Sequence, residues 1–90
     1  LPYPADLFAT RGDYTDRVML TWSSVPGATS YKLYRRNGTV PQSLLVTQAG
    51  TDYDDYAVVR PTSYYYAVSA CNASGCSPQS PEVLGYVNRS

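Results

Sequence analysis

Acidic side chains are the first candidates for chemistry in this chain, because the sequence contains no histidine. Its absence removes the commonest general base and every Ser-His triad. One run concentrates carboxylates, Asp52-Tyr53-Asp54-Asp55. On a strand, Asp52 and Asp54 would share a face, and paired carboxylates serve glycoside hydrolysis or hold a hard cation such as calcium. The alternative is a solvated strand face with aspartates that cap turns.

Two cysteines form the second candidate group. Cys71 and Cys76 flank the run Asn72-Ala73-Ser74-Gly75, which has the composition of a tight turn. Across a hairpin they would face each other at disulfide distance, and a disulfide implies an oxidising compartment. Free thiols and half of a metal site are the alternatives. The chain has no histidine or second cysteine pair to complete a tetrahedral site, and the C-x4-C spacing is not the redox C-x-x-C, so we expect no cofactor.

A third candidate is the tripeptide Arg11-Gly12-Asp13, a sequence well known as a cell-adhesion signal. Glycine and aspartate are also ordinary turn residues, so the same letters describe a surface loop. The choice between an adhesion site and a turn depends on where the tripeptide lies in the fold.

Alternating apolar and polar residues predict the strands that must position these groups. In residues 17–22, Val18, Leu20 and Trp22 share one face, and Tyr31 and Leu33 do the same in residues 30–36. No segment shows a sustained helical period. The predicted strands cover residues 7–10, 17–22, 30–36, 43–48, 51–55, 63–71 and 82–87, with turn signals between them.

Seven short strands in 90 residues predict an all-β fold, a seven-stranded antiparallel sandwich of two sheets. The length fits a single domain spanning residues 1–90. Seven basic and seven acidic residues cancel, so no charge draws the chain toward nucleic acid, and no apolar run is long enough for membrane insertion. No signal peptide is visible, which suggests an excised or mature segment. We expect a monomer in isolation.

Five sequence features in order resemble the fibronectin type III family over about residues 4–88. They are Pro4 before the first strand, Trp22 at the end of the second, GATSYKLYR at 27–35 with TDYDD at 51–55, and YYYAVSACNASGCS at 64–77. The last is similar to the family pattern Tyr-x-Tyr-x-Val-x-Ala-x-Asn-x-x-Gly-x-Ser. The sequence of these segments looks most like that of modules found in secreted or surface-displayed bacterial proteins. One departure is Pro61-Thr62-Ser63, where the family usually has Pro-Gly-Thr.

The resemblance implies an immunoglobulin-like sandwich and assigns structural roles to its aromatic residues. Trp22 would pack between the sheets, and Tyr64 would be the tyrosine corner, its hydroxyl bonded to backbone near Val59 or Arg60. Adhesive members of the family display the adhesion tripeptide on the loop between the last two strands. Here it falls in the first interstrand loop, which favours the turn interpretation. The expected core residues are Trp22, Tyr31, Leu33, Tyr64, Tyr66 and Val68.

Parity leaves a second set of side chains pointing outward, with Tyr34 and Tyr65 as its centre. Lys32, Arg36 and Ser69 would be their neighbours. Such tyrosines can pair with each other across strands, pack against a neighbouring domain, or stack on sugar rings. Three Asn-x-Ser/Thr triplets, at Asn37, Asn72 and Asn88, are glycosylation acceptors in a eukaryotic secretory host and turn residues in a bacterial one.

These interpretations predict a non-catalytic extracellular module, secreted or at the cell surface, that spaces and orients domains of a larger protein. A sandwich this small leaves little room for a catalytic cleft. The expected partners are neighbouring domains of the same polypeptide. The alternatives are a module that binds polysaccharide or a cell-surface protein, and an accessory domain of a secreted glycoside hydrolase or other hydrolase.

Overall fold

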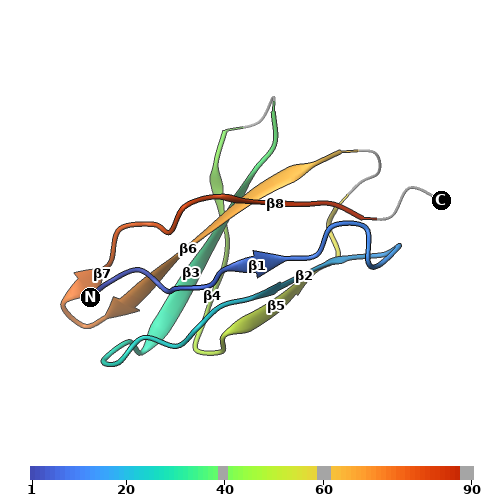
Figure 1. Ribbon diagram of the computed structural model, residues 1–90. Coiled ribbons are helices and arrows are strands. Elements are labelled where there is room, and N and C mark those ends of the chain that lie inside the picture. The colour runs from blue at the N-terminus through green and yellow to red at the C-terminus, as the bar shows by residue number, and fades with distance from the viewer. Residues whose placement is uncertain (39–40, 59–61, 88–90) are drawn as a thin grey trace.

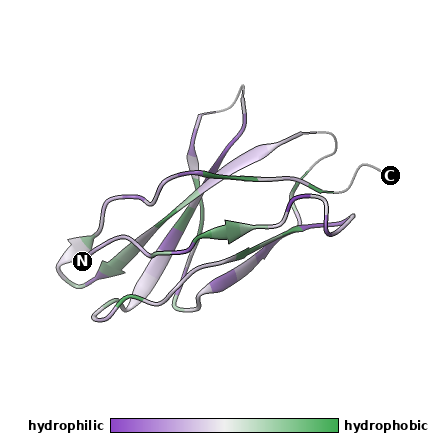
Figure 2. Cartoon of the chain, in the orientation of Figure 1, coloured by the Kyte–Doolittle hydropathy of each residue, from purple (hydrophilic) through white to green (hydrophobic). Residues whose placement is uncertain are grey.

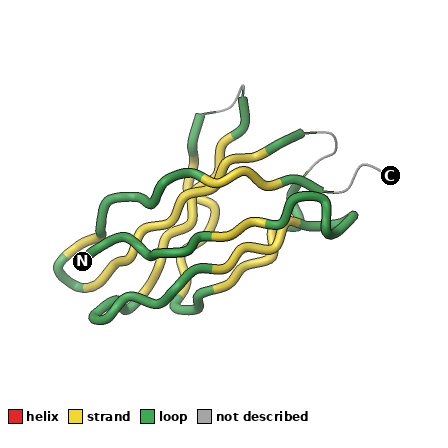
Figure 3. The backbone as a smooth tube through the Cα atoms, in the orientation of Figure 1, coloured by secondary structure: helices red, strands yellow, loops and turns green. Residues whose placement is uncertain are grey.

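The chain folds into two packed antiparallel sheets, which confirms the predicted fold class. A computed structural model describes residues 1–38, 41–58 and 62–87. This described part is all strand and loop, without a helix (Figures 1 and 3), so it holds no helix that could span a membrane. The strands are β1 (Phe8–Ala9), β2 (Val18–Thr21), β3 (Ser30–Arg36), β4 (Ser43–Gln48), β5 (Asp52–Asp55), β6 (Tyr64–Asn72), β7 (Gly75–Cys76) and β8 (Val83–Gly85).

The smaller sheet has three strands in the order β1-β2-β5. Its register places Met19 opposite Asp54 and Leu20 opposite Tyr53. Because side chains alternate across a strand, Val18 and Leu20 face the core, while Met19 and Thr21 face outward. Both inward residues are fully buried.

The larger sheet runs in the order β4-β3-β6-β7, and β8 also pairs with β6. β3 and β6 form its centre, with Leu33 opposite Val68 and Tyr34 opposite Ala67. The pairing of β3 with β4 shifts between Leu33 and Tyr34, so one extra residue of β4 is accommodated there.

Two aromatic rings fill the space between the sheets. Trp22 and Tyr31 meet edge to face, with ring centroids 6.0 Å apart, a favoured arrangement of aromatic pairs. The Tyr31 hydroxyl accepts a hydrogen bond of 2.8 Å from the Val25 amide. The buried core also contains Leu33, Tyr64, Tyr66 and Val68, the other residues expected there.

The last part of the chain contains one strand more than predicted. The strand expected over residues 82–87 is present as the three-residue β8, and a two-residue β7 that was not predicted lies directly after the hairpin turn. Between them lie Pro78 and Pro81, which lack the amide hydrogen that a continuous ladder requires. Two short strands therefore form here instead of one continuous strand, and the described residues contain eight strands where seven were predicted.

Serine side chains complete the hydrogen bonds where the chain passes from β7 to β8. The Ser77 and Ser80 amides donate to the carbonyls of Ala70 and Val68. Their hydroxyls accept from the amides of the same two β6 residues, at 2.9 and 3.0 Å. Both serines are buried, so β6 keeps its backbone groups paired without a regular partner strand.

Close approach of the sheets requires a glycine at the end of β8. A Cβ at Gly85 would lie 2.9 Å from Val18 and 3.0 Å from both Ala9 and Tyr66. No ordinary side chain fits at these distances, so Gly85 lets β8 pack directly over the core.

Candidate functional site

The cysteine pair closes the hairpin between β6 and β7. Cys71 and Cys76 lie opposite each other in the register, and their sulfurs form a disulfide, which confirms that prediction. Their Cα atoms are 4.0 Å apart. The Asn72 side chain belongs to the same turn, since its Oδ1 accepts from the Ser74 amide at 2.8 Å. The disulfide is therefore a local clamp on the hairpin.

The tripeptide Arg11-Gly12-Asp13 begins the loop between β1 and β2. Arg11 forms a parallel bridge with Tyr86, and the Gly12 amide donates to the Tyr86 carbonyl at 2.9 Å. Gly12 has φ +81°, a conformation that favours glycine. The Arg11 and Asp13 residues are exposed on either side of this attachment. The loop is thus fastened to the segment after β8 instead of projecting freely.

The carboxylates of β5 divide into two environments. Asp52 and Asp54 are exposed on the outer face of the smaller sheet, and Asp54 lies 3.6 Å from the Arg17 guanidinium. Within residues 1–38, 41–58 and 62–87, no group of three or more metal-binding side chains occurs. This pair therefore has no third carboxylate beside it in the described part of the chain to complete a calcium site.

The third carboxylate of this run, Asp55, is buried and joins the two sheets. Its Oδ2 accepts from Arg35 Nη1 and from the Tyr66 hydroxyl, each at 2.8 Å. Its Oδ1 accepts from the Ala57 amide at 3.1 Å. Burial, and then the Asp55 charge, raise the pKa of Tyr66 far above its ordinary value, so this tyrosine stays protonated and donates. The group is a structural network.

This network was not predicted, but the sequence held a signal for it. Tyr53 and Asp55 have the same parity, and so do Leu33 and Arg35. Each charged residue therefore follows an inward-facing one by two positions, which turns both charged side chains toward the space between the sheets.

The outward-facing tyrosines of the larger sheet lie among polar contacts. Tyr34 and Tyr65 are half-buried, as are Lys32 and Arg36. The Arg36 guanidinium lies 4.5 Å from the Tyr65 ring centroid and forms two hydrogen bonds of 2.7 Å to Glu82. One face of the Tyr65 ring is thus covered by a cation, which leaves less of it open for stacking on a ligand.

A second polar bridge crosses the same face. The side chains of Gln42 and Gln79 exchange hydrogen bonds of 2.8 and 2.9 Å. They extend from opposite margins of the larger sheet, next to β4 and β7, and both are exposed, so the bridge passes over the outer surface. Beneath this face Ala67 and Ser69 are buried, including the serine expected beside the tyrosines at the surface.

Several sequence predictions involve residues that lie outside the described part of the chain. Tyr64 is buried and opens β6, but its expected backbone partner, Val59 or Arg60, lies outside the described residues. Asn88 also lies outside them, as does Thr39 of the triplet that begins at Asn37.

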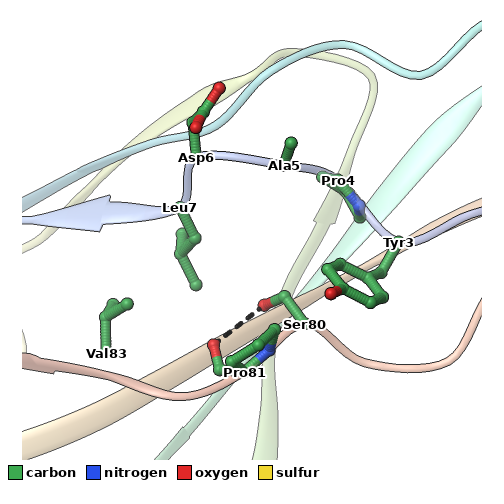
Figure 4. A pocket seen from close by; sticks show the side chains of 8 residues that line it. All are labelled: Tyr3, Pro4, Ala5, Asp6, Leu7, Ser80, Pro81 and Val83. Atoms are coloured by element: carbon green, nitrogen blue, oxygen red, sulfur yellow. Dashed lines mark hydrogen bonds between the residues drawn. The ribbon is translucent and has the colours of Figure 1, made fainter.

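The hollow shown in Figure 4 lies between the N-terminal segment and the segment before β8, with a volume of about 320 Å³. Tyr3, Leu7, Pro81 and Val83 give it a largely apolar lining, and Ser80 lies at its base. Asp6, its one carboxylate, turns away from these residues and accepts a hydrogen bond from Ser23 at 3.2 Å. The hollow therefore lacks the paired groups that acid–base chemistry requires.

Two antiparallel sheets, a three-stranded one and a larger one centred on β3 and β6, define an immunoglobulin-like sandwich. No family model matches the chain. It is, however, similar to a solved Fn3-like protein from Clostridium thermocellum, with 30% identity and a TM-score of 0.82. The match covers 98% of this chain and 94% of that one. The chain belongs to the fibronectin type III family, as the sequence resemblance predicted.

Two curated proteins are also similar to the chain. An amylopullulanase from Thermoanaerobacterium saccharolyticum is 34% identical over 74 residues, and a poly(3-hydroxybutyrate) depolymerase from Delftia acidovorans is 35% identical over 75 residues. These matches cover 80% and 83% of this chain, but only 6% and 14% of the two relatives. The similarity thus concerns one small part of each larger protein.

Proposed function

We propose that this chain is a non-catalytic module of a larger secreted hydrolase, with a folded core of about residues 4–88, and that it holds neighbouring domains at a set distance. The two curated relatives, an amylopullulanase and a depolymerase, support a parent protein that degrades a polymer. The separation of the β5 carboxylates into an exposed pair, Asp52 and Asp54, and a buried structural one, Asp55, supports a module without chemistry of its own.

The observation that carries this proposal is the elongated shape. The molecule measures 43 × 23 × 18 Å. Its N-terminus lies at one end of the long axis, and the segment after β8 runs toward the other end (Figure 1). Domains attached at the two ends would be separated by the whole length of the sandwich. The disulfide between Cys71 and Cys76 supports an extracellular location.

Binding through the larger sheet is the weaker candidate function. Tyr34 and Tyr65 are half-buried, and Arg36 already occupies one face of the Tyr65 ring. Adhesion through Arg11-Gly12-Asp13 is weaker still, because the loop is tied to Tyr86 by backbone hydrogen bonds. The partly covered Tyr65 ring and the attachment of the tripeptide to the segment after β8 therefore favour neither kind of recognition.

Replacement of the module in its parent tests the spacing role. One variant carries a flexible glycine-serine linker of equal residue number, and a second carries an unrelated rigid β-sandwich of similar length. We expect the linker to lower hydrolysis of the insoluble polymer, the unrelated sandwich to restore it, and hydrolysis of short soluble substrates to stay unchanged. Loss of polymer hydrolysis with the unrelated sandwich as well would overturn the spacing role.

A further inference from the structure

The outer face of the smaller sheet carries an aromatic and charged cluster that the spacing role does not use. Arg17 lies just before β2, with its guanidinium 4.0 Å from the Tyr14 ring centroid and 5.9 Å from that of Tyr56. It also pairs with Asp16 at 3.1 Å and lies 3.6 Å from Asp54. The cation therefore holds two tyrosines and two carboxylates together at one end of the sheet.

This face is open to solvent and extends along the strands. Tyr56 is 62% exposed, and at the other end of the face Phe8 is 49% exposed. Phe8 pairs with Thr21, four residues from Arg17, so the two aromatic positions are about 13 Å apart along the strands. Asp54 lies between them on β5, and Asp52 lies in the same row as Phe8, on the other side of Thr21. Figure 2 colours much of β5 as hydrophilic.

Such a surface has the chemistry that recognises an uncharged polysaccharide. A flat ring binds the apolar face of a sugar, while carboxylates accept from its hydroxyls and a guanidinium donates to them. Small ligands prefer concave pockets, whereas an open face with two separated rings suits an extended chain. The charges of Asp16, Asp52 and Asp54 outnumber that of Arg17, which disfavours polyanions, including nucleic acids. The centre of this face carries charged groups, whereas the core of a protein interface is depleted in them, and this disfavours a protein partner.

We propose that the outer face of the three-stranded sheet, centred on Tyr56 and Arg17, binds a chain of uncharged polysaccharide. The inference rests on the proposed function, because it takes this polymer to be the substrate of the hydrolase to which the module is attached. The module would then hold the polymer on one sheet while its long axis sets the distance to the next domain.

Retention of the 90-residue chain on granular starch and microcrystalline cellulose tests the proposal. We expect the unchanged chain to be retained on at least one of them. Tyr56→Ala should weaken this binding about tenfold, the effect of losing an aromatic anchor. Arg17→Gln should also weaken it, because Tyr14 and Tyr56 lose the cation that orders them. Tyr65→Ala, on the opposite sheet, is the matched control and should bind like the unchanged chain.

Three outcomes would overturn the proposal: no retention on either polymer, equal retention of the Tyr56→Ala variant, or retention on poly(3-hydroxybutyrate) granules alone. Circular dichroism of each variant separates lost binding from lost folding. None of these outcomes affects the linker replacement, which measures spacing in the parent protein. The two proposals can therefore fail independently.

Discussion

Asp55 and Arg35 form an ion pair of 2.8 Å that crosses from one sheet to the other. Asp55 extends from β5 of the smaller sheet and Arg35 from β3 of the larger one. The aspartate side chain is 1% exposed, so its charge depends on the arginine and on the Tyr66 hydroxyl for compensation. A buried pair of this kind fixes how two surfaces meet, although it adds little net stability compared with apolar residues.

Removing one partner should therefore be costly. Asp55→Ala leaves the Arg35 guanidinium and the Tyr66 hydroxyl without their acceptor in the core, and we expect a loss of about 3–5 kcal/mol in unfolding free energy. Urea denaturation followed by tryptophan fluorescence measures this through Trp22. Asp52→Ala, on the exposed face of the same strand, should change the value by less than about 0.5 kcal/mol. Equal effects of the two substitutions would contradict the assigned role of Asp55.

The Ser80 hydroxyl should matter more than its size suggests. Ser80→Ala leaves the buried Val68 amide without its side-chain acceptor, and we expect a loss of about 1–3 kcal/mol. Hydrogen exchange of the Val68 amide should accelerate in the variant, because its bond to the hydroxyl is gone. Ser74→Ala, at the exposed hairpin turn, provides the control. Unchanged protection of the Val68 amide would show that another group satisfies it.

The disulfide should stabilise the chain modestly, since it closes a short loop. Replacing both Cys71 and Cys76 by alanine should lower the unfolding free energy by about 2 kcal/mol on the chain-entropy model. Without reductant, the unchanged protein should gain no mass on alkylation. Uptake of two alkyl groups under those conditions would mean that the cysteines are free thiols.

The Arg36–Glu82 pair predicts a pH effect at the surface. Two hydrogen bonds from Arg36 lower the pKa of Glu82 below its usual value near 4.3. A carboxylate with a depressed folded pKa contributes stability above its unfolded pKa, and this contribution is lost as the pH falls through the folded pKa. The stability difference between the unchanged chain and Arg36→Gln should therefore shrink below about pH 4.

Carboxyl titration by NMR tests the same pair directly. In Arg36→Gln the pKa of Glu82 should rise toward the ordinary value, because the donor of both hydrogen bonds is gone. Lys32→Gln removes another cation of the same face and should leave the Glu82 titration unchanged. A Glu82 pKa that does not respond to Arg36→Gln would rule out this cause of the shift.

Alternation along the strands predicted most of the fold. It placed Val18, Leu20 and Trp22 on one inward face, and the turn residues between cysteines predicted the hairpin they close. These patterns are local, so a single strand or turn carries enough information. Strand β7 was not predicted, because its two residues, Gly75 and Cys76, are too few to show an alternating pattern.

The candidate sites depended on contacts between distant strands, which no local pattern contains. The parity that Asp55 shares with Tyr53 indicates an inward side chain, but its partner Arg35 lies on the other sheet, and no pattern within β5 identifies that partner. The cluster around Arg17 was missed for the same reason. Tyr56 follows β5 and comes close to Arg17 only because β5 pairs with β2. Register across strands decides both cases.

The division between β7 and β8 also bears on how such modules behave side by side. A bare sheet margin is a template on which another chain can add a strand, and repeated modules risk aggregation by that route. Here Ser77 and Ser80 occupy the hydrogen-bonding groups of β6 with their own backbone and hydroxyls. Pro78 and Pro81 offer no amide hydrogen to an incoming strand. This margin is thus capped against cross-pairing, so neighbouring copies in one polypeptide would not join their sheets along it.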